Sequence, residues 1–181
     1  MKVSFKNLII NLIHLFYEEH IGFGKTRLIK LAYLVELEYY RRNREQLTDA
    51  DWIYYKFGPY PNNYNDYLDA KGLSIEEEES NGFAVIAPKE FSTPPPMDDN
   101  IIRLSRNLMK KFGNMELNKL LDYVYYNTEP MMNVNERMEK LNFAVAFTLD
   151  QCKIKPLSLD DKTKKNIQRK YKEKIKNTYA L

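Results

Sequence analysis

The fold is decided by residues 24–68, GKTRLIKLAYLVELEYYRRNREQLTDADWIYYKFGPYPNNYNDYL, which combine an apolar helical segment, a dense aromatic run and a sharp turn. The first part predicts a helix from an N-cap at Thr26 to about Arg42. Apolar residues cover more than half of its circumference, so we expect it to be the central helix of the core. Lys30 is a lone cation in an apolar turn, and we expect its ammonium to extend to solvent or to face a partner.

The second part of this stretch predicts a short strand and an abrupt stop. Residues 52–57, WIYYKF, are aromatic and β-branched, which favours a strand that is buried on both faces or presents one face to a partner. Residues 58–61, GPYP, should end the strand, because glycine allows a turn and proline removes hydrogen-bond donors. A third helix should follow at about 62–72. Its apolar side consists of Tyr64, Tyr67 and Leu68.

On the N-terminal side, residues 4–20 place apolar side chains at helical spacing and predict a core helix. Gly22 and Gly24 allow the chain to leave this helix, and His20 lies where a cation complements the C-terminal dipole. The letters GKT at 24–26 match the end of a phosphate-binding loop, but the first glycine of that motif is missing and a helix precedes it where a strand is required. We therefore expect no nucleotide site there.

A β-hairpin is predicted after the central stretch. Residues 73–75 and 83–87 are strand-like and flank a turn that contains Asn81-Gly82, and we expect strand 52–57 to lie alongside them. The four carboxylates of residues 76–79 should lie in a solvated turn. Helices followed by a hairpin also occur in this order in winged-helix DNA-binding domains, which are the structural alternative.

Two further helices are predicted after the proline-rich connector at 88–96. The first begins at Asp98 or Asp99 and closes at Gly113, and the second has Asn114 as its N-cap. Each carries an apolar stripe at helical spacing, so we expect both to pack on the core.

The last part of the domain is less regular. Residues 136–140 look helical, whereas residues 141–149, LNFAVAFTL, could form a strand or a buried helix, because periodicity does not separate the two. Together the patterns predict a mainly α-helical fold with a small antiparallel β-sheet or hairpin, which is the α+β class. We expect a single compact domain at 1–152 and a basic helical extension at 153–181.

Charge is unevenly distributed along the chain. The net charge is +3, but residues 153–181 hold ten Lys and Arg against three Asp and Glu, which leaves the preceding residues net acidic. The basic segment predicts a helix with one thin apolar line, so it should dock on the body, dock on another chain, or fray. This line consists of Ile167, Tyr171, Ile175 and Tyr179. The basic face is also able to contact nucleic-acid phosphates.

The composition argues against several kinds of site. Cys152 is the single cysteine, which excludes an intramolecular disulfide, and only His14 and His20 accompany it, too few for a structural zinc. No apolar run approaches the ~20 residues that a membrane-spanning helix needs, and the N-terminal helix carries no cleavage signature. We therefore expect a cytoplasmic protein that binds no metal, no cofactor and no membrane.

The central stretch carries the pattern of a known family. The matching positions are Leu28, Lys30, Leu31, Tyr33, Leu34, Glu38, Tyr39, Leu47, Phe57, Gly58, Pro59 and Tyr64. In order and spacing they resemble the Panacea antitoxin domain, also described as SocA-like or phage-associated Gep-like. The resemblance continues at Phe112, Gly113, Glu116, Leu117, Thr128 and Pro130. It therefore covers about residues 1–150.

This resemblance implies an α-rich domain without catalytic activity that binds and neutralises a cognate toxin encoded beside it. One branch of the family also acts as an adaptor that hands the toxin to a protease. The chain departs from the family pattern at three places: Phe57 replaces a tyrosine, residues 42–46 lack the usual glycine, and Met131 replaces a tryptophan. These departures leave the identity of the partner and the oligomeric state open.

Protein binding is the function that the residues favour. Acid-base catalysis needs convergent carboxylates or a histidine, and the acidic residues here lie in helix flanks and a turn. Nucleic-acid binding would use the basic extension, but the rest of the chain is acidic. The aromatic and proline-rich run at 52–67 has the composition of a binding surface. We predict partner contacts by Lys30, Tyr33, Tyr54, Phe57, Gly58, Pro59, Tyr60, Tyr64, Ile167, Tyr171 and Ile175.

Overall fold

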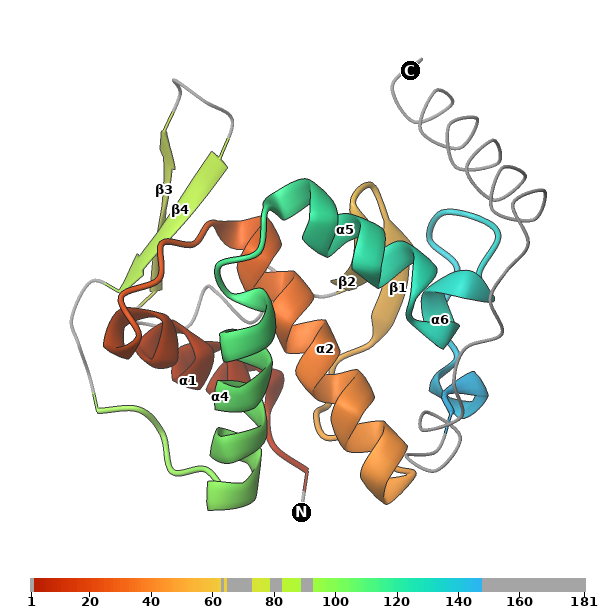
Figure 1. The fold of residues 1–181 in the computed structure, drawn as a ribbon, viewed down its shortest axis with the longest axis horizontal. Helices are drawn as coiled ribbons and strands as arrows, with labels where there is room; N and C mark the ends of the chain where they lie inside the picture. The colour runs from red at the N-terminus through yellow and green to blue at the C-terminus, as the bar shows by residue number, and fades with distance from the viewer. Residues whose placement is uncertain (1, 63, 65–72, 79–82, 89–92, 148–181) are drawn as a thin grey trace. The chain divides into compact units, whose positions relative to one another are not determined.

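Helix α2 (Lys25–Asn43) lies at the centre of the part of the chain that the structure describes (Figure 1). The structure is a computed structural model and describes residues 2–62, 64, 73–78, 83–88 and 93–147. All ten residues from Leu28 to Leu37 of α2 are buried. A helix that is buried on every side must be enclosed by other elements. The predicted role of this segment as the central helix is confirmed.

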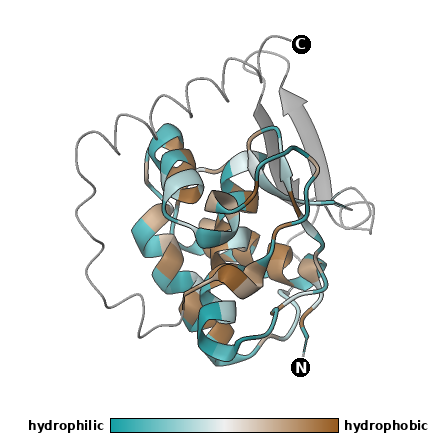
Figure 2. Ribbon diagram, turned by 90° about the vertical axis from the view of Figure 1, so that its right-hand side faces the viewer, coloured by the Kyte–Doolittle hydropathy of each residue, from teal (hydrophilic) through white to brown (hydrophobic). Residues whose placement is uncertain are grey.

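Three helices pack around α2: α1 (Phe5–Glu18), α4 (Asp99–Phe112) and α5 (Leu117–Tyr126). Their buried side chains form one core with those of α2. Figure 2 shows hydrophobic residues on the sides of the helices that face the middle of the fold. The largest fully buried side chains include Trp52, Tyr33, Tyr64, Phe5 and Phe16. Within the described residues, no helix is both long enough and apolar enough to cross a membrane.

The observed ends of α1 and α2 agree only in part with the predicted ones. Ser4 caps α1, since its Oγ accepts a hydrogen bond from the backbone N–H of Asn7 at 3.2 Å. The residue that turns the chain after α1 is His20, which takes a left-handed φ of 53° where a glycine was expected to provide the exit. The predicted N-cap Thr26 is wrong, because α2 begins at Lys25 and Gly24 is its N-cap.

The two helices predicted after the connector are present. Asp98 is the N-cap of α4, and its carboxylate accepts a hydrogen bond from the backbone N–H of Asn100 at 2.7 Å, as predicted. The start of α5 is corrected from Asn114, because its N-cap is Glu116. A further short helix, α6 (Glu129–Met132), follows and has proline in its first turn.

The chain after α6 differs from the prediction. The helix predicted at 136–140 is wrong, because these residues form turns and part of a β ladder. The segment left open between strand and helix contains a 3₁₀ turn, η1 (Phe143–Val145), in otherwise irregular backbone as far as residue 147. Residues 138–141 pair with residues 52–54, which are far away in the sequence. Local periodicity does not reveal such pairing.

Two antiparallel hairpins are present. One pairs β1 (Trp52–Tyr55) with β2 (Gly58–Pro61), and the other pairs β3 (Leu73–Glu78) with β4 (Phe83–Pro88). The second hairpin was predicted and is confirmed, but its expected alignment beside 52–57 is wrong, because the two hairpins belong to separate sheets. The acidic run also starts inside β3 and not in the turn.

Strand β2 was missed because its prolines suggested an end to the strand. Pro59 and Pro61 alternate, so their nitrogens lie on the same side of the strand. The backbone N–H of Asn62 donates to Asp51 O at 2.8 Å, which places the even-numbered N–H groups of this segment on the side facing β1. The proline nitrogens therefore point away from β1, to the edge of β2 that packs against α2, where no ladder hydrogen bond is lost.

Two predicted segments fall largely or wholly outside the described residues. Of the third helix at 62–72, the structure describes Asn62 and Tyr64, and Tyr64 is buried. The basic extension at 153–181, with Ile167, Tyr171 and Ile175, lies outside them altogether. Residues up to Ala146 form one compact unit, and the boundary predicted at 152 stays a prediction.

Candidate partner-binding surface

Lys30 occupies the interior of the fold. Its side chain is 2% exposed, and its ammonium Nζ donates a hydrogen bond to the backbone oxygen of Pro59 in β2 at 2.9 Å. Burial lowers the pKa of Lys30 to about 7. The expectation that its ammonium would reach solvent is therefore corrected, because in this structure Lys30 joins α2 to the hairpin. Its contact with a partner stays a prediction.

Three of the tyrosines predicted to contact a partner are also buried. Tyr33 donates a hydrogen bond from its hydroxyl to Oγ1 of Thr128 at 3.0 Å, and burial raises its pKa. The ring of Tyr54 packs edge-on against Tyr125, with 6.2 Å between centroids, and Tyr64 is also enclosed. The structure gives these rings a packing role, and their contact with a partner stays a prediction.

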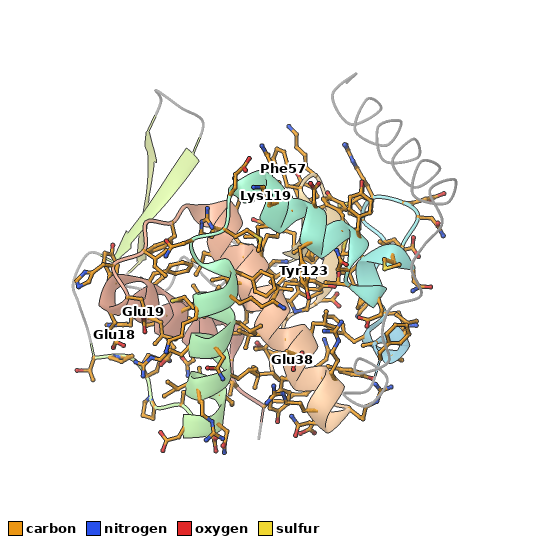
Figure 3. All side chains as sticks on the ribbon, in the orientation of Figure 1. Glu18, Glu19, Glu38, Phe57, Lys119 and Tyr123 are labelled. Carbon is orange, nitrogen blue, oxygen red and sulfur yellow. The ribbon has the colours of Figure 1, made fainter. Side chains whose placement is uncertain are left out.

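The turn of the first hairpin brings aromatic side chains to the surface. Phe57 is 42% exposed and Tyr55 is 45% exposed, whereas Gly58 and Pro59 beside them are buried. Gly58 has a φ of 93°, which residues with a side chain rarely adopt. Figure 3 places Phe57 at the upper margin of the described fold, away from Glu38 on α2. Of the predicted contact residues, Phe57 is the most accessible in the described part.

A third backbone segment extends this hairpin. Ile53 forms an antiparallel bridge with Lys140, the N–H of Leu141 donates to Trp52 O at 2.8 Å, and the N–H of Tyr54 donates to Glu139 O at 2.9 Å. Residues 138–141 therefore line the edge of β1 opposite β2. This pairing could not be predicted from the sequence, because more than eighty residues separate the two segments.

Met138 forms a β-bulge at this edge. Its N–H donates to Tyr54 O at 2.7 Å, so Met138 and Glu139 both bond to Tyr54. Met138 has a φ of 68°, and in this kind of bulge the first residue is usually glycine, which tolerates the left-handed region. The carboxylate of Glu139 accepts hydrogen bonds from the N–H groups of Asn135 and Glu136 and fixes the loop. The Met138 side chain is nevertheless 57% exposed.

The outward face of the hairpin is aromatic. In the register of β1 and β2, Tyr55 and Tyr60 lie on the face opposite Trp52 and Tyr54, whose side chains enter the core. The rings of Tyr55 and Tyr60 are 5.4 Å apart, and those of Tyr60 and Tyr64 are 5.2 Å apart. Burial raises the pKa of Tyr60, which is half-buried, to about 12. We call Tyr55, Phe57 and Tyr60 the hairpin face.

Lysines border the hairpin face. The ammonium of Lys25 lies 4.3 Å from the ring centroid of Tyr64 and 5.7 Å from that of Tyr60, and that of Lys56 lies 5.6 Å from the ring of Phe57. Lys140 forms an ion pair with Asp51 at 2.5 Å, and its side chain is 74% exposed. Cations over aromatic rings are attracted by the ring quadrupole. The face is therefore apolar at its centre and cationic at its border.

The remaining polar residues of α2 have structural contacts. Glu36 is fully buried and accepts hydrogen bonds from the N–H groups of Leu47 and Thr48 at 2.6 and 3.2 Å, while burial raises its pKa. Arg27 donates to the backbone oxygens of Gly113 and Met115 at 2.7 and 2.6 Å. These contacts tie α2 to the loop before β1 and to the segment between α4 and α5.

The arginines near the C-terminal end of α2 reach two further segments. Arg41 Nη2 bonds both carboxylate oxygens of Glu129 in α6, at 2.9 and 2.7 Å. Arg44 has left-handed backbone and donates to Ala146 O at 2.8 Å. The polar residues of α2 thus join it to elements across the described unit and are not grouped around one cavity.

Sequence reasoning identified part of this surface and missed the rest. It selected Phe57 and Tyr60 from their density of aromatic rings. It omitted Tyr55, and alternation along β1 would not have indicated its exposure, because Ile53 on the same face is buried. Met138 could not be found from the sequence, because its position depends on the long-range pairing with Tyr54.

A comparison with family models matches residues 28–130 of the chain to the family described as "Antitoxin SocA-like, Panacea domain". This range includes most of α2, both hairpins, α4 and α5, and ends at Pro130 in α6. No curated protein and no solved structure matches the chain.

Proposed function

Because the chain belongs to the SocA-like antitoxin family with the Panacea domain, we propose that it is an antitoxin that neutralises a cognate toxin by binding to it directly. The observation that carries this proposal is the family match, which spans more than half of the chain. We propose that the chain acts in the cytoplasm, that it performs no catalysis and that the toxin is encoded by a neighbouring gene.

The hairpin face supports a binding role. Exposed aromatic side chains held on a rigid backbone are enriched at protein interfaces, because they bury a large area and lose little conformational entropy. Tyr55 lies in β1 and Phe57 lies in the two-residue turn that joins β1 to β2, and the side chains of both are exposed. The polar contacts of α2 hold this platform in place.

Co-expression tests the proposed function. The neighbouring gene is induced in a host with and without the gene for this chain, and growth is followed. We expect growth arrest with the neighbour alone and recovery when both are present. A neighbour that is harmless alone, or arrest that this chain fails to relieve, would contradict the proposal.

Delivery of the toxin to a protease is a second part of the proposal and rests on the same family membership. It predicts that the half-life of the toxin shortens when this chain is present and that the shortening disappears in a host without the responsible protease. Neutralisation with an unchanged toxin half-life would show that binding alone is sufficient.

A further inference from the structure

The Met138 bulge combines backbone strain with exposure. Glycine or asparagine would adopt the left-handed conformation of this position more readily than methionine. The methionine side chain does not compensate by filling the core, because more than half of it is exposed. Non-glycine residues held in this region of backbone space occur at binding sites, where the surrounding structure fixes them. Its hydrogen bond to Tyr54 O places its backbone one residue from Tyr55 of the hairpin face, along the edge of β1 that faces away from β2.

We propose that the hairpin face, together with Met138, is the surface that contacts the toxin, and that the toxin segment bound there is acidic and carries apolar side chains. This inference rests on the proposed function and specifies where and with what chemistry the binding occurs. Tyr55, Phe57 and Tyr60 supply flat apolar area, and Met138 supplies a flexible thioether that adapts to the partner.

The lysines that border the hairpin face favour an acidic partner segment. Lys25, Lys56 and Lys140 surround the aromatic centre, although the chain before residue 153 is net acidic. A cationic border on an otherwise acidic chain favours approach of carboxylates to this face and repels other basic surfaces. Asp51, which pairs with Lys140, can be displaced by a carboxylate of the partner.

Both edges of the first hairpin are covered. Residues 138–141 pair with β1, and β2 lies against α2, where the buried Lys30 donates to Pro59 O. A partner strand therefore finds no open edge, and addition of a strand to the sheet is disfavoured. The partner must contact side chains of the hairpin face instead.

The substitution Met138→Gly distinguishes a role of Met138 in binding from a role in stability. For the wild-type chain and for the variant, we measure the dissociation constant with the toxin and the midpoint of urea unfolding. We expect the unfolding midpoint to rise, because glycine relieves the strained backbone, while binding weakens about tenfold or more. Met132→Ala is the matched control, since Met132 is 60% exposed on α6, and it should change neither quantity.

Tyr55→Ser and Lys56→Glu test the remaining features. Tyr55→Ser should weaken toxin binding about tenfold or more, and Lys56→Glu should weaken it most at low salt, because screening reduces charge attraction. Wild-type protein that binds toxin while all three variants bind equally well would overturn this inference and leave the proposed function intact. Wild-type protein that does not bind toxin would overturn both. Variants that weaken binding to a DNA duplex but not to toxin would assign the face to nucleic acid and contradict the proposal.

Discussion

A buried lysine connects the central helix to the hairpin. Lys30 is one of the positions by which the sequence resembles the family, and its ammonium donates a hydrogen bond to Pro59 O. A charged ammonium in the interior loses its hydration, so the neutral amine is favoured there relative to water. The role of Lys30 is therefore to hold β2 against α2.

The pH dependence of stability reports on Lys30. Its pKa is about 7 in the folded chain and 10.5 without burial, so between these values the unfolded chain binds more protons. The free energy of unfolding should therefore rise with pH in this window, by at most about 1.4 kcal/mol per unit, whereas below pH 7 both states are protonated and this term is constant. Urea unfolding at pH 7, 8 and 9 measures the rise.

Lys30→Met is the comparison for this measurement. Methionine has a side chain of similar length and cannot titrate. The free energy of unfolding of wild type should therefore increase relative to that of the variant from pH 7 to 9. Groups that titrate in both proteins cancel in this difference. Parallel pH profiles would show that Lys30 does not carry the shift.

The turn of the first hairpin depends on Gly58. Its φ is 93°, and a Cβ added to it would lie 3.5 Å from the nearest ring atom of Tyr125. That distance is ordinary van der Waals contact, so backbone strain and not collision limits substitution here.

Gly58→Ala should lower the free energy of unfolding by about 1 kcal/mol, because alanine disfavours the left-handed backbone. The control is Gly22→Ala, where no atom lies within 4 Å of an added Cβ and φ is outside the left-handed region. It should change stability by less than about 0.5 kcal/mol. Equal effects of the two substitutions in urea unfolding would contradict the assignment of strain to Gly58.

The contact between α2 and α6 includes an ion pair that is mostly buried. The side chains of Arg41 and Glu129 are only 12% and 8% exposed. Arg41→Ala should lower the free energy of unfolding by about 3 kcal/mol, since it leaves a buried carboxylate without this cation. Arg42→Ala is the exposed control and should cost less than about 1 kcal/mol, because its pair with Glu38 is solvated.

A double substitution sharpens this test. Arg41→Met combined with Glu129→Met removes both charges and keeps apolar volume, so most of the lost stability should return. A double variant as unstable as the sum of its single variants would show that the two residues contribute independently.

At the scale of the whole molecule, the predicted boundary at 152 defines a truncation. Residues up to Ala146 form one compact unit, and the basic extension begins at Lys153. We expect residues 1–152 to unfold cooperatively with the same midpoint as the full chain. If the full chain associates with a DNA duplex in a salt-sensitive way, that association should disappear with the extension, because residues 153–181 hold ten Lys and Arg against three Asp and Glu. A broad or shifted transition would place residues beyond 152 in the folding unit.

Prediction from sequence worked where the determinants are local. The periodicity of α1, α2 and α4 and the cap at Asp98 were visible in short windows. Strand β2 was missed because proline interrupts central strands but fits a strand edge that makes no ladder hydrogen bonds. The burial of Lys30 and the bulge at Met138 were missed because they depend on residues far away in the chain, Pro59 and Tyr54.

The covered edges of the first hairpin also bear on how this chain behaves at high concentration. Exposed ring-bearing hairpins are prone to stack into fibres when their backbone offers a template for another copy. Here residues 138–141 and helix α2 occupy the two edges, while the side chains of Tyr55 and Phe57 stay exposed. Substitutions on the hairpin face can therefore change which protein is recognised without opening a route to self-polymerisation.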